Sequence, residues 1–187
     1  MPGTGTGSGR DEDTGRGREP GTAAVRALAI TASNRAAAGV YEDRSGPVLV
    51  ELLRSAGVEA VDGPLVVPDG EPVEAALRKA VAAGYDVVVT TGGTGLTPGD
   101  LTPEMTRRVV DREVPGIAEA VRAAGAAAGV PAAILSRGIA GLAGRTLIVN
   151  LPGSTGGVRD GMAVLSPVLG HAIDQAHGGD HVASRDT

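Results

Sequence analysis

The chain has 187 residues, enough for one domain with a sizeable core, and 42% of them are hydrophobic, as expected for a globular protein. A formal net charge of −5 and an aromatic content of 1% argue against a nucleic-acid partner, which requires phosphate neutralisation or base stacking. The sequence contains no cysteine, which excludes disulfides, thiolate metal sites and thiol nucleophiles. Because no apolar run is long enough to cross a membrane and no hydrophobic signal segment begins the chain, we expect a cytoplasmic protein without a membrane partner.

The two ends of the chain differ in composition from the region between them. Residues 1–24 are mainly Gly, Thr, Arg, Asp and Glu, and so little apolar surface cannot offset the entropy of ordering the segment. We therefore expect a disordered low-complexity tail there and a second, polar tail over residues 179–187. Residues 25–178 are predicted to form a single domain.

The first half of this domain alternates apolar runs of strand length with segments in which apolar residues recur at helical spacing. Strands or extended segments are expected over residues 25–31, 58–67 and 86–90. Helices are expected over residues 47–54 and 72–83, and a glycine follows each of these patterns as a helix stop.

The second half begins with a helix predicted over residues 103–112, with Thr102 as its N-cap and Pro103 in its first position. Further helices are expected over residues 116–128 and 158–176. The remaining pieces are predicted to be extended over 132–135, extended or bulged over 139–142, and a strand over 145–150.

Strands that are apolar throughout and alternate with amphipathic helices indicate a three-layer α/β/α fold, with a mostly parallel central sheet covered on both faces. In such folds, ligands bind outside the carboxyl ends of the strands. The polar segments that follow the predicted strands are residues 33–35, 68–69, 91–100 and 150–154. We expect these four segments to converge on one crevice.

Residues 90–106 combine a strand end, a Gly/Thr loop and the start of a helix. Gly92, Gly93 and Gly95 lack a Cβ where the backbone turns, so the N–H groups of the loop, including that of Thr94, can converge on an anion such as a phosphate. The loop is neither a Walker motif, which requires Gly-Lys-Ser or Gly-Lys-Thr, nor a dinucleotide fingerprint, because Pro98 stands where a third glycine is needed. The pattern alone leaves both a phosphate cradle and a plain tight turn open.

Asp69 and Asp100 are the carboxylates best placed to bind a hard cation. Magnesium is usually held by one or two carboxylates together with substrate phosphates and water, so these two residues would suffice. The alternative for Asp69 is a structural role in a Pro-Asp-Gly turn, and the residue pattern favours it slightly. The alternative for Asp100 is a cap on local backbone, which its position beside the glycines disfavours.

Ser136 and Ser154 also follow predicted elements, but no nearby histidine in the sequence can act as their base, so a serine-hydrolase mechanism is a poor fit. Each remains a candidate hydrogen-bond donor to a phosphate or a pterin. The histidines lie in or after the last predicted helix, away from the strand ends, at positions 171, 177 and 181.

With these motifs in view, the chain resembles the molybdenum-cofactor biosynthesis proteins of the MogA/MoaB type over about residues 25–177. The most specific matches are residues 90–104 (TTGGTGLTPGDLTPE), 111–116 (DREVPG), 135–137 (LSR) and 150–154 (NLPGS). The resemblance implies a three-layer α/β domain that assembles as a homotrimer. It also implies an activity, molybdopterin adenylyltransferase, in which the terminal phosphate of molybdopterin attacks the α-phosphorus of Mg-ATP and pyrophosphate is released.

The resemblance further assigns roles to residues of this sequence. Asp69 and Asp100 match the acidic catalytic residues of the family and would hold Mg²⁺ against the triphosphate. Gly92, Gly93, Thr94 and Gly95 would cradle a phosphate. The residues expected to line the pterin or nucleotide side are Ser136, Pro152, Gly153 and Ser154.

The sequence departs from the family pattern after the first strand, where many relatives have Ser-Asp-Arg and this chain has Ser33-Asn34-Arg35. A carboxylate role is therefore absent at this position, while Ser33 and Arg35 remain candidate phosphate-binding residues. The main alternative function is a non-catalytic trimer that binds molybdopterin or acts as a scaffold. Molybdate insertion, which would follow adenylylation and receive its product, is found in longer multidomain relatives, and a related fold occurs in competence-associated proteins.

Overall fold

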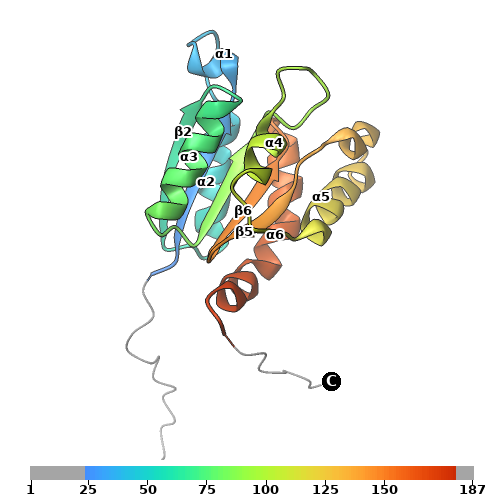
Figure 1. Ribbon diagram of the computed structural model, residues 1–187. Helices are drawn as coiled ribbons and strands as arrows, with labels where there is room; N and C mark the ends of the chain where they lie inside the picture. The colour runs from blue at the N-terminus through green and yellow to red at the C-terminus, as the bar shows by residue number, and fades with distance from the viewer. Residues whose placement is uncertain (1–23, 180–187) are drawn as a thin grey trace, which may run out of the picture.

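A six-stranded sheet forms the centre of the molecule (Figure 1). This computed structural model describes residues 24–179. Across the sheet, the strands follow the order β2 (Ala60–Val67), β1 (Arg26–Ala32), β3 (Val87–Thr91), β6 (Thr146–Leu151), β5 (Ala140–Ala143) and β4 (Arg112–Glu113). The pairs β1–β2, β1–β3 and β3–β6 are parallel, whereas β5 and β4 are antiparallel to their neighbours. The predicted mostly parallel sheet is confirmed.

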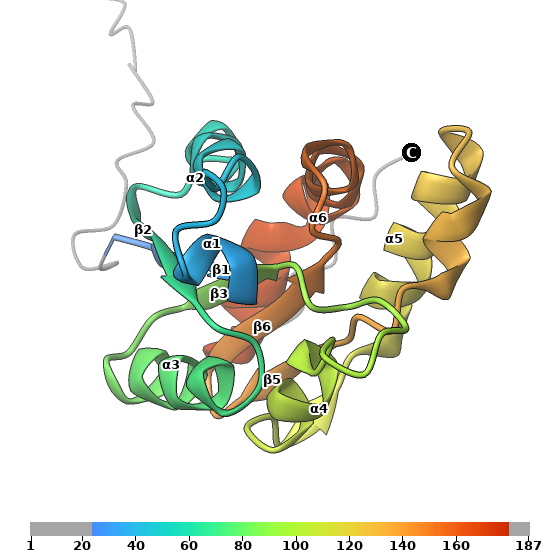
Figure 2. The same cartoon turned by 90° about the horizontal axis from the view of Figure 1, so that it is seen from above.

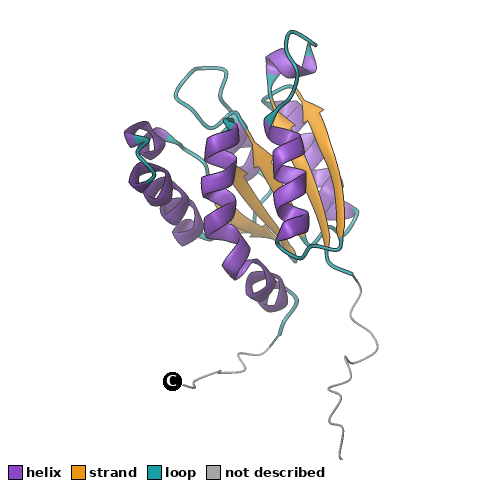
Figure 3. Ribbon diagram, turned by 180° about the vertical axis from the view of Figure 1, so that it is seen from behind, coloured by secondary structure: helices purple, strands orange, loops and turns teal. Residues whose placement is uncertain are grey.

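Helices cover both faces of the sheet because successive side chains of each central strand point to opposite sides. Ala27 and Ala29 pack in one core cluster, whereas Leu28 and Ile30 pack in the other. The first cluster includes side chains of α2 (Ser45–Ser55), α5 (Pro115–Ala127) and α6 (Thr155–Ala176). The second includes side chains of α3 (Glu71–Ala82) and of the segment around α4 (Thr102–Arg107). Figure 2 shows these two helical layers with the sheet between them, and Figure 3 shows the face covered by α2, α6 and α5.

The predicted helix over residues 103–112 is too long and its cap is misplaced. The helix α4 begins at Thr102 and ends at Arg107, with Leu101 in the N-cap position. Thr102 does not cap the helix, because its hydroxyl donates to the carboxylate of Asp69 instead. The chain then leaves the helix to pair with β5, starting with a hydrogen bond from the Asp111 amide to the Leu142 carbonyl.

Two further differences concern short segments. The extended piece predicted over 132–135 is wrong, because a 3₁₀ helix, η1 (Pro131–Leu135), occupies it. A four-residue helix, α1 (Asn34–Ala37), follows β1 where only a polar turn was expected. The other predicted strands and helices are confirmed with small shifts at their ends. The predicted tails lie outside the described residues except for Ala24 and Gly179, and within the described part no helix is long and apolar enough to cross a membrane.

The parallel pairing brings the carboxyl ends of three strands to one edge of the sheet. Thr31 of β1 pairs with Thr91 of β3, which in turn pairs with Leu151 of β6. Beneath this edge, the Asn150 side chain, only 3% exposed, donates hydrogen bonds to the hydroxyls of Thr90 and Thr106. These bonds join two strands to α4, so the segments that follow the strands start from fixed positions.

The first turn after β3 depends on glycine. Gly92 has a φ of +98°, and a Cβ placed there would lie 2.4 Å from the carbonyl oxygen of Ala32 at the end of β1. Two strand ends therefore approach each other more closely than any side chain at position 92 would permit.

We expect Gly92→Ala to lower the free energy of unfolding by about 1–3 kcal/mol or more, because both the φ angle and the contact with Ala32 oppose a Cβ. Gly170→Ala is the matched control, since a Cβ at this exposed position of α6 meets no atom within 4 Å. In a helix interior this change should raise stability by about 0.5–1 kcal/mol. Urea unfolding measures both, and an unchanged midpoint for Gly92→Ala would contradict the argument.

Candidate functional site

Two cavities lie at the edge where the parallel strands end, with volumes of about 720 Å³ and 500 Å³. The glycine-rich loop, residues 92–101, contributes to both: Gly92 and Gly93 line the first cavity, and Thr94 and Gly95 line the second. The predicted site residues are divided accordingly. The first cavity contains Ser33, Arg35, Asp69, Gly92, Gly93, Asp100 and Gly153, and the second contains Thr94, Gly95, Ser136, Pro152 and Ser154.

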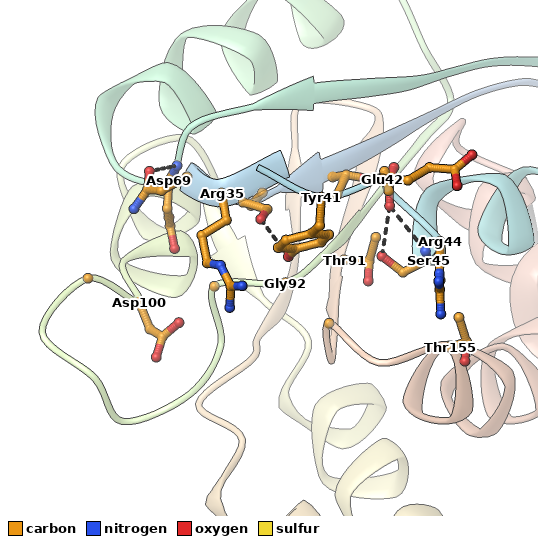
Figure 4. Close-up of a pocket in the computed structure, with 18 of the residues that line it drawn as sticks. Arg35, Tyr41, Glu42, Arg44, Ser45, Asp69, Thr91, Gly92, Asp100 and Thr155 are labelled. Carbon is orange, nitrogen blue, oxygen red and sulfur yellow. Dashed lines mark hydrogen bonds between the residues drawn. The ribbon is translucent and has the colours of Figure 1, made fainter. Parts of the chain in front are cut away.

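The first cavity is built from the ends of four strands, as the connectivity predicts. Its lining includes Ser33 after β1, Asp69 after β2, Gly93 after β3 and Gly153 after β6. In the view of Figure 4, Asp69 and Asp100 lie at one end of this cavity, Arg44 and Thr155 at the other, and Arg35 and Tyr41 between them. The cavity therefore has carboxylates at both ends, since Glu42 lies on the same side as Arg44, and it has arginines between and beside them.

Asp69 is held by several hydrogen bonds. Its Oδ1 accepts from the Gly70 amide at 2.7 Å and from the Thr102 hydroxyl at 3.0 Å, and its Oδ2 accepts from the Leu101 amide at 3.0 Å. The bond to Gly70 is the turn interaction expected from the Pro-Asp-Gly sequence, but the other two join the end of β2 to the start of α4. The carboxylate thus has a structural role as well as a place in the cavity.

Asn34 fixes the backbone on the other side of Asp69. Its amide oxygen accepts from the Asp69 N–H at 3.0 Å. The resemblance to MogA/MoaB-type proteins leads us to expect a carboxylate at this position, and the asparagine keeps a hydrogen-bond acceptor there without a negative charge.

Asp100 bonds to its own loop. Its Oδ2 accepts from both the amide and the hydroxyl of Thr97, at 2.9 Å and 2.7 Å. Local capping, disfavoured for this residue on the sequence, is therefore present. The bonds occupy one carboxylate oxygen only, and among the described residues the other oxygen, Oδ1, has no hydrogen-bond partner.

Glycine permits both carboxylates to lie against the loop. A Cβ at Gly93, where φ is +62°, would lie 2.0 Å from Oδ2 of Asp69, and a Cβ at Gly95 would lie 2.8 Å from Oδ2 of Asp100. Position 93 therefore needs glycine both for its φ and for these contacts, whereas a side chain at position 95 would require the Asp100 carboxylate to shift. The sequence argument, which assigned the glycines to phosphate contact, did not include this constraint.

The donor set of the site fits a divalent cation that brings most of its own ligands. Within residues 24–179, no group of three or more His, Cys, Asp or Glu side chains is arranged to hold a metal ion. The available protein ligands are Oδ1 of Asp100 and the remaining lone pair of Oδ2 of Asp69. One or two carboxylates completed by phosphate oxygens and water are typical of Mg²⁺ and not of a closed structural metal site.

Ser33 and Arg35 both line the first cavity, and their side chains make different contacts with Tyr41. The Ser33 hydroxyl accepts from the Ala36 amide as the N-cap of α1 and lies 2.9 Å from the Tyr41 hydroxyl. The Arg35 guanidinium lies over the ring of Tyr41, 4.9 Å from its centroid. Stacking on a ring does not use the N–H donors of the guanidinium, which lie in its plane, so Arg35 can bind an anion in the cavity.

The second cavity has mainly apolar walls, supplied by Val121, Val130, Ala133 and Leu135, with Ser136 and Ser154 among its polar residues. The Ser154 hydroxyl caps α6 by accepting from the Gly157 amide at 3.0 Å. The 22-residue helix α6 begins between the two cavities, because Thr155 lines the first and Gly156 lines the second. Its N-terminus provides partial positive charge, which favours an anion at this junction.

Sequence reasoning missed several residues of the site. Tyr41 and Arg44 line the first cavity but were not among the site residues proposed from the sequence. Asp43, beside them, accepts hydrogen bonds from the amides of Ser45 and Gly46, which begin α2. The available signal was an Asp-Arg-Ser-Gly-Pro sequence before a helical pattern, since an acceptor side chain and a first-turn proline mark a helix start.

Comparison with known proteins identifies close relatives. The family described as the probable molybdopterin binding domain matches residues 28–171. The chain is 36% identical over 148 residues to a molybdopterin adenylyltransferase of Helicobacter pylori, covering 78% of this chain and 84% of that protein. It is 38% identical over 159 residues to a molybdenum cofactor biosynthesis bifunctional protein of Synechococcus elongatus, covering 85% of this chain but only 50% of that protein, so it spans half the length of this relative.

The fold is shared with solved structures. The structure of the molybdopterin biosynthesis Mog protein from Mycobacterium ulcerans superposes with a TM-score of 0.78 at 52% identity. The alignment covers 82% of this chain and 99% of that one. The two chains therefore share their fold over most of their lengths.

The different bonding of the two carboxylates predicts different effects of removing their charge. In Asp69→Asn, one end of the side chain becomes an NH₂ group that faces N–H or O–H donors, and the loss of accepted bonds should cost about 1–3 kcal/mol of unfolding free energy. In Asp100→Asn, the amide oxygen can replace Oδ2 and the NH₂ group can replace Oδ1, so stability should change by less than about 0.5 kcal/mol. Chemical denaturation of both variants tests this, and equal losses would refute it.

Proposed function

Because the chain belongs to the molybdopterin-binding domain family of molybdenum-cofactor biosynthesis proteins, we propose that it is a molybdopterin adenylyltransferase. The observation that supports this best is the position of Asp69 and Asp100, which border the glycine-rich loop where two cavities meet. Two ligands that each carry phosphate would approach one another at such a junction. Curated relatives that bear this name, such as the protein of Helicobacter pylori, align over most of the chain.

In the proposed reaction, an oxygen of the terminal phosphate of molybdopterin forms a bond to the α-phosphorus of ATP. The bond between this phosphorus and the bridging oxygen of the β-phosphate breaks, and pyrophosphate leaves with the electron pair. A phosphate monoester is largely a dianion near neutral pH, so the attacking oxygen requires no general base. In keeping with this, neither of the described histidines, His171 and His177, lines either cavity.

The work left to the protein is to position two anions and reduce their repulsion. Asp69 and Asp100 would hold Mg²⁺, which when bound to ATP offsets the negative charge of the triphosphate. Arg35 and the N-terminus of α6 would provide positive charge and N–H donors for the phosphates. In this proposal, Gly92 to Gly95 let the loop approach the phosphates closely, and Ser136, Pro152, Gly153 and Ser154 contact the pterin or nucleotide.

The alternative is a protein of the same family that binds molybdopterin without catalysis. The second cavity alone, with its apolar walls, would be enough for binding a planar ring. The free Oδ1 of Asp100 favours the enzyme, because pterin binding alone gives no use for a carboxylate held in the neighbouring cavity.

We expect Asp100→Asn to reduce formation of adenylylated molybdopterin by about 100-fold or more while molybdopterin still binds, because an amide cannot hold Mg²⁺ as a carboxylate does. Product and pyrophosphate are measured chromatographically with purified protein, molybdopterin and Mg-ATP. Asp111→Asn is the control, since the Asp111 carboxylate accepts from the Gly144 amide and lines neither cavity. A wild-type protein that binds molybdopterin but forms no product would establish the alternative.

The proposal includes a cytoplasmic homotrimer that passes its product to a molybdate-inserting enzyme. An assembly is supported by Ile134 of η1, which is 65% exposed and lines neither cavity; its apolar neighbours Val130 and Leu135, 51% and 52% exposed, also border the second cavity. Apolar side chains grouped on a surface often mark a protein contact. Light scattering during gel filtration should give three times the 18.5 kDa mass of the chain, and a monomer would exclude this part of the proposal.

A further inference from the structure

Arg137 donates hydrogen bonds to the glycine-rich loop on both sides of its exposed residues, 96–99. It follows η1, and its backbone N–H donates to the Thr94 carbonyl at 2.8 Å. Its side-chain Nε donates to the Gly95 carbonyl at 2.7 Å, and a terminal nitrogen donates to the Asp100 carbonyl. The other terminal nitrogen donates to the carboxylate of Glu104 in α4. One guanidinium therefore bridges residues 95 and 100 and connects both to a helix.

This bridge is the main contact of a segment that has little packing of its own. Residues 96–99 are all exposed, and Leu96 is 63% exposed despite its apolar side chain. Burial therefore contributes little to holding these residues in one conformation. Hydrogen bonds from the Arg137 guanidinium can hold the segment instead. Its N–H donors point in fixed directions, so they set the separation and orientation of the Gly95 and Asp100 carbonyl groups.

The conformation of this segment determines where the Asp100 carboxylate points. Oδ2 of Asp100 accepts from the Thr97 amide, and the Asp100 amide donates to the Thr97 carbonyl at 3.0 Å. If residues 95 and 100 moved apart, this small turn would open and the carboxylate would rotate with it. Arg137 itself lines neither cavity, so any effect on the reaction would pass through the loop.

We propose that Arg137 is a positioning residue: by bridging the carbonyl groups of Gly95 and Asp100, it directs the Asp100 carboxylate toward the phosphates of the bound nucleotide. The identity of that ligand rests on the proposed function. The bridging role in the loop rests only on the hydrogen bonds of Arg137.

The structural part is tested by amide hydrogen exchange on the full chain, measured for peptides that cover residues 95–101. Arg137→Ala should speed exchange of the Thr97 and Asp100 amides by about tenfold or more, because the bonds that protect them depend on the closed turn. Arg137→Lys should do the same, since an ammonium lacks the fork that matches two carbonyl groups. Arg107→Ala is the control, because Arg107 is paired with Glu113 on the surface of α4 and lines neither cavity.

The functional part is tested by steady-state kinetics with Mg²⁺ varied. Arg137→Ala should lower kcat by about tenfold or more and raise the Mg²⁺ concentration for half-maximal rate, while KM for molybdopterin stays close to the wild-type value. Millimolar guanidinium should partly restore kcat of Arg137→Ala but not of Arg137→Lys, where the ammonium fills the site. A general loss of folding would not show this difference.

Unchanged exchange in residues 95–101 would overturn the proposal, as would faster exchange with unchanged kcat and Mg²⁺ dependence. If Arg137→Ala does not fold, Arg137→Lys and Glu104→Gln, which keep the length and polarity of the side chains, decide the same question. Wild-type protein without turnover would refute the proposed function and not the bridge, which the exchange rates would then decide alone.

Discussion

The close approach of two strand ends determines the geometry of the whole site. The carbonyl oxygen of Ala32 at the end of β1 lies where a side chain at position 92 would begin, so the chain leaving β3 must turn with a positive φ. Gly93 continues this turn and brings the loop against the Asp69 carboxylate, which itself bonds to the start of α4. Glycine is thus required at two successive positions, at 92 by the end of β1 and at 93 by the side chains of Asp69 and Thr102.

The loop that results separates two cavities of different character. The first has carboxylates and arginines around it, and the second is bounded mainly by aliphatic side chains. A single strand end can form both because the loop turns away from the sheet immediately, exposing Gly92 and Gly93 on one side and Thr94 and Gly95 on the other. Charged and apolar parts of two ligands can therefore be held apart while their phosphates lie close to the same backbone.

Much of this architecture could be predicted from the sequence, because its strongest signals are local. Continuous apolar strands and amphipathic helices indicated the layers, and the ends of parallel strands indicated the edge at which polar residues meet. Both errors around α4 arose where a long-range contact overrides a local preference. Thr102 has the side chain of an N-cap, but its hydroxyl donates a hydrogen bond to the carboxylate of Asp69, 33 residues earlier. Residues 108–112 continue a helical pattern, yet the helix ends at Arg107, a turn follows, and Arg112 pairs with Leu142 of β5.

The missed site residues have the same cause. Arg137 belongs to the LSR segment that carries part of the family resemblance, but nothing in that segment shows what its side chain does, because the partners of the guanidinium lie 33 to 42 residues away in the sequence. The twelve site residues proposed from the sequence were grouped by strand end, but their division between two cavities depends on which way the loop turns. That direction is set by the contact between Gly92 and Ala32, which no pattern within either segment reveals.

Asn34 illustrates how a structural requirement and a charge can be separated at one position. The bond to the Asp69 N–H needs only an acceptor oxygen, and both an asparagine and an aspartate provide one. The ionised carboxylate would add a negative charge beside Asp69, near the place proposed for the phosphates. With asparagine, the backbone of Asp69 stays fixed while repulsion of a polyphosphate is reduced. The asparagine therefore keeps the acceptor that the Asp69 backbone uses and adds no further carboxylate beside Asp69 and Asp100.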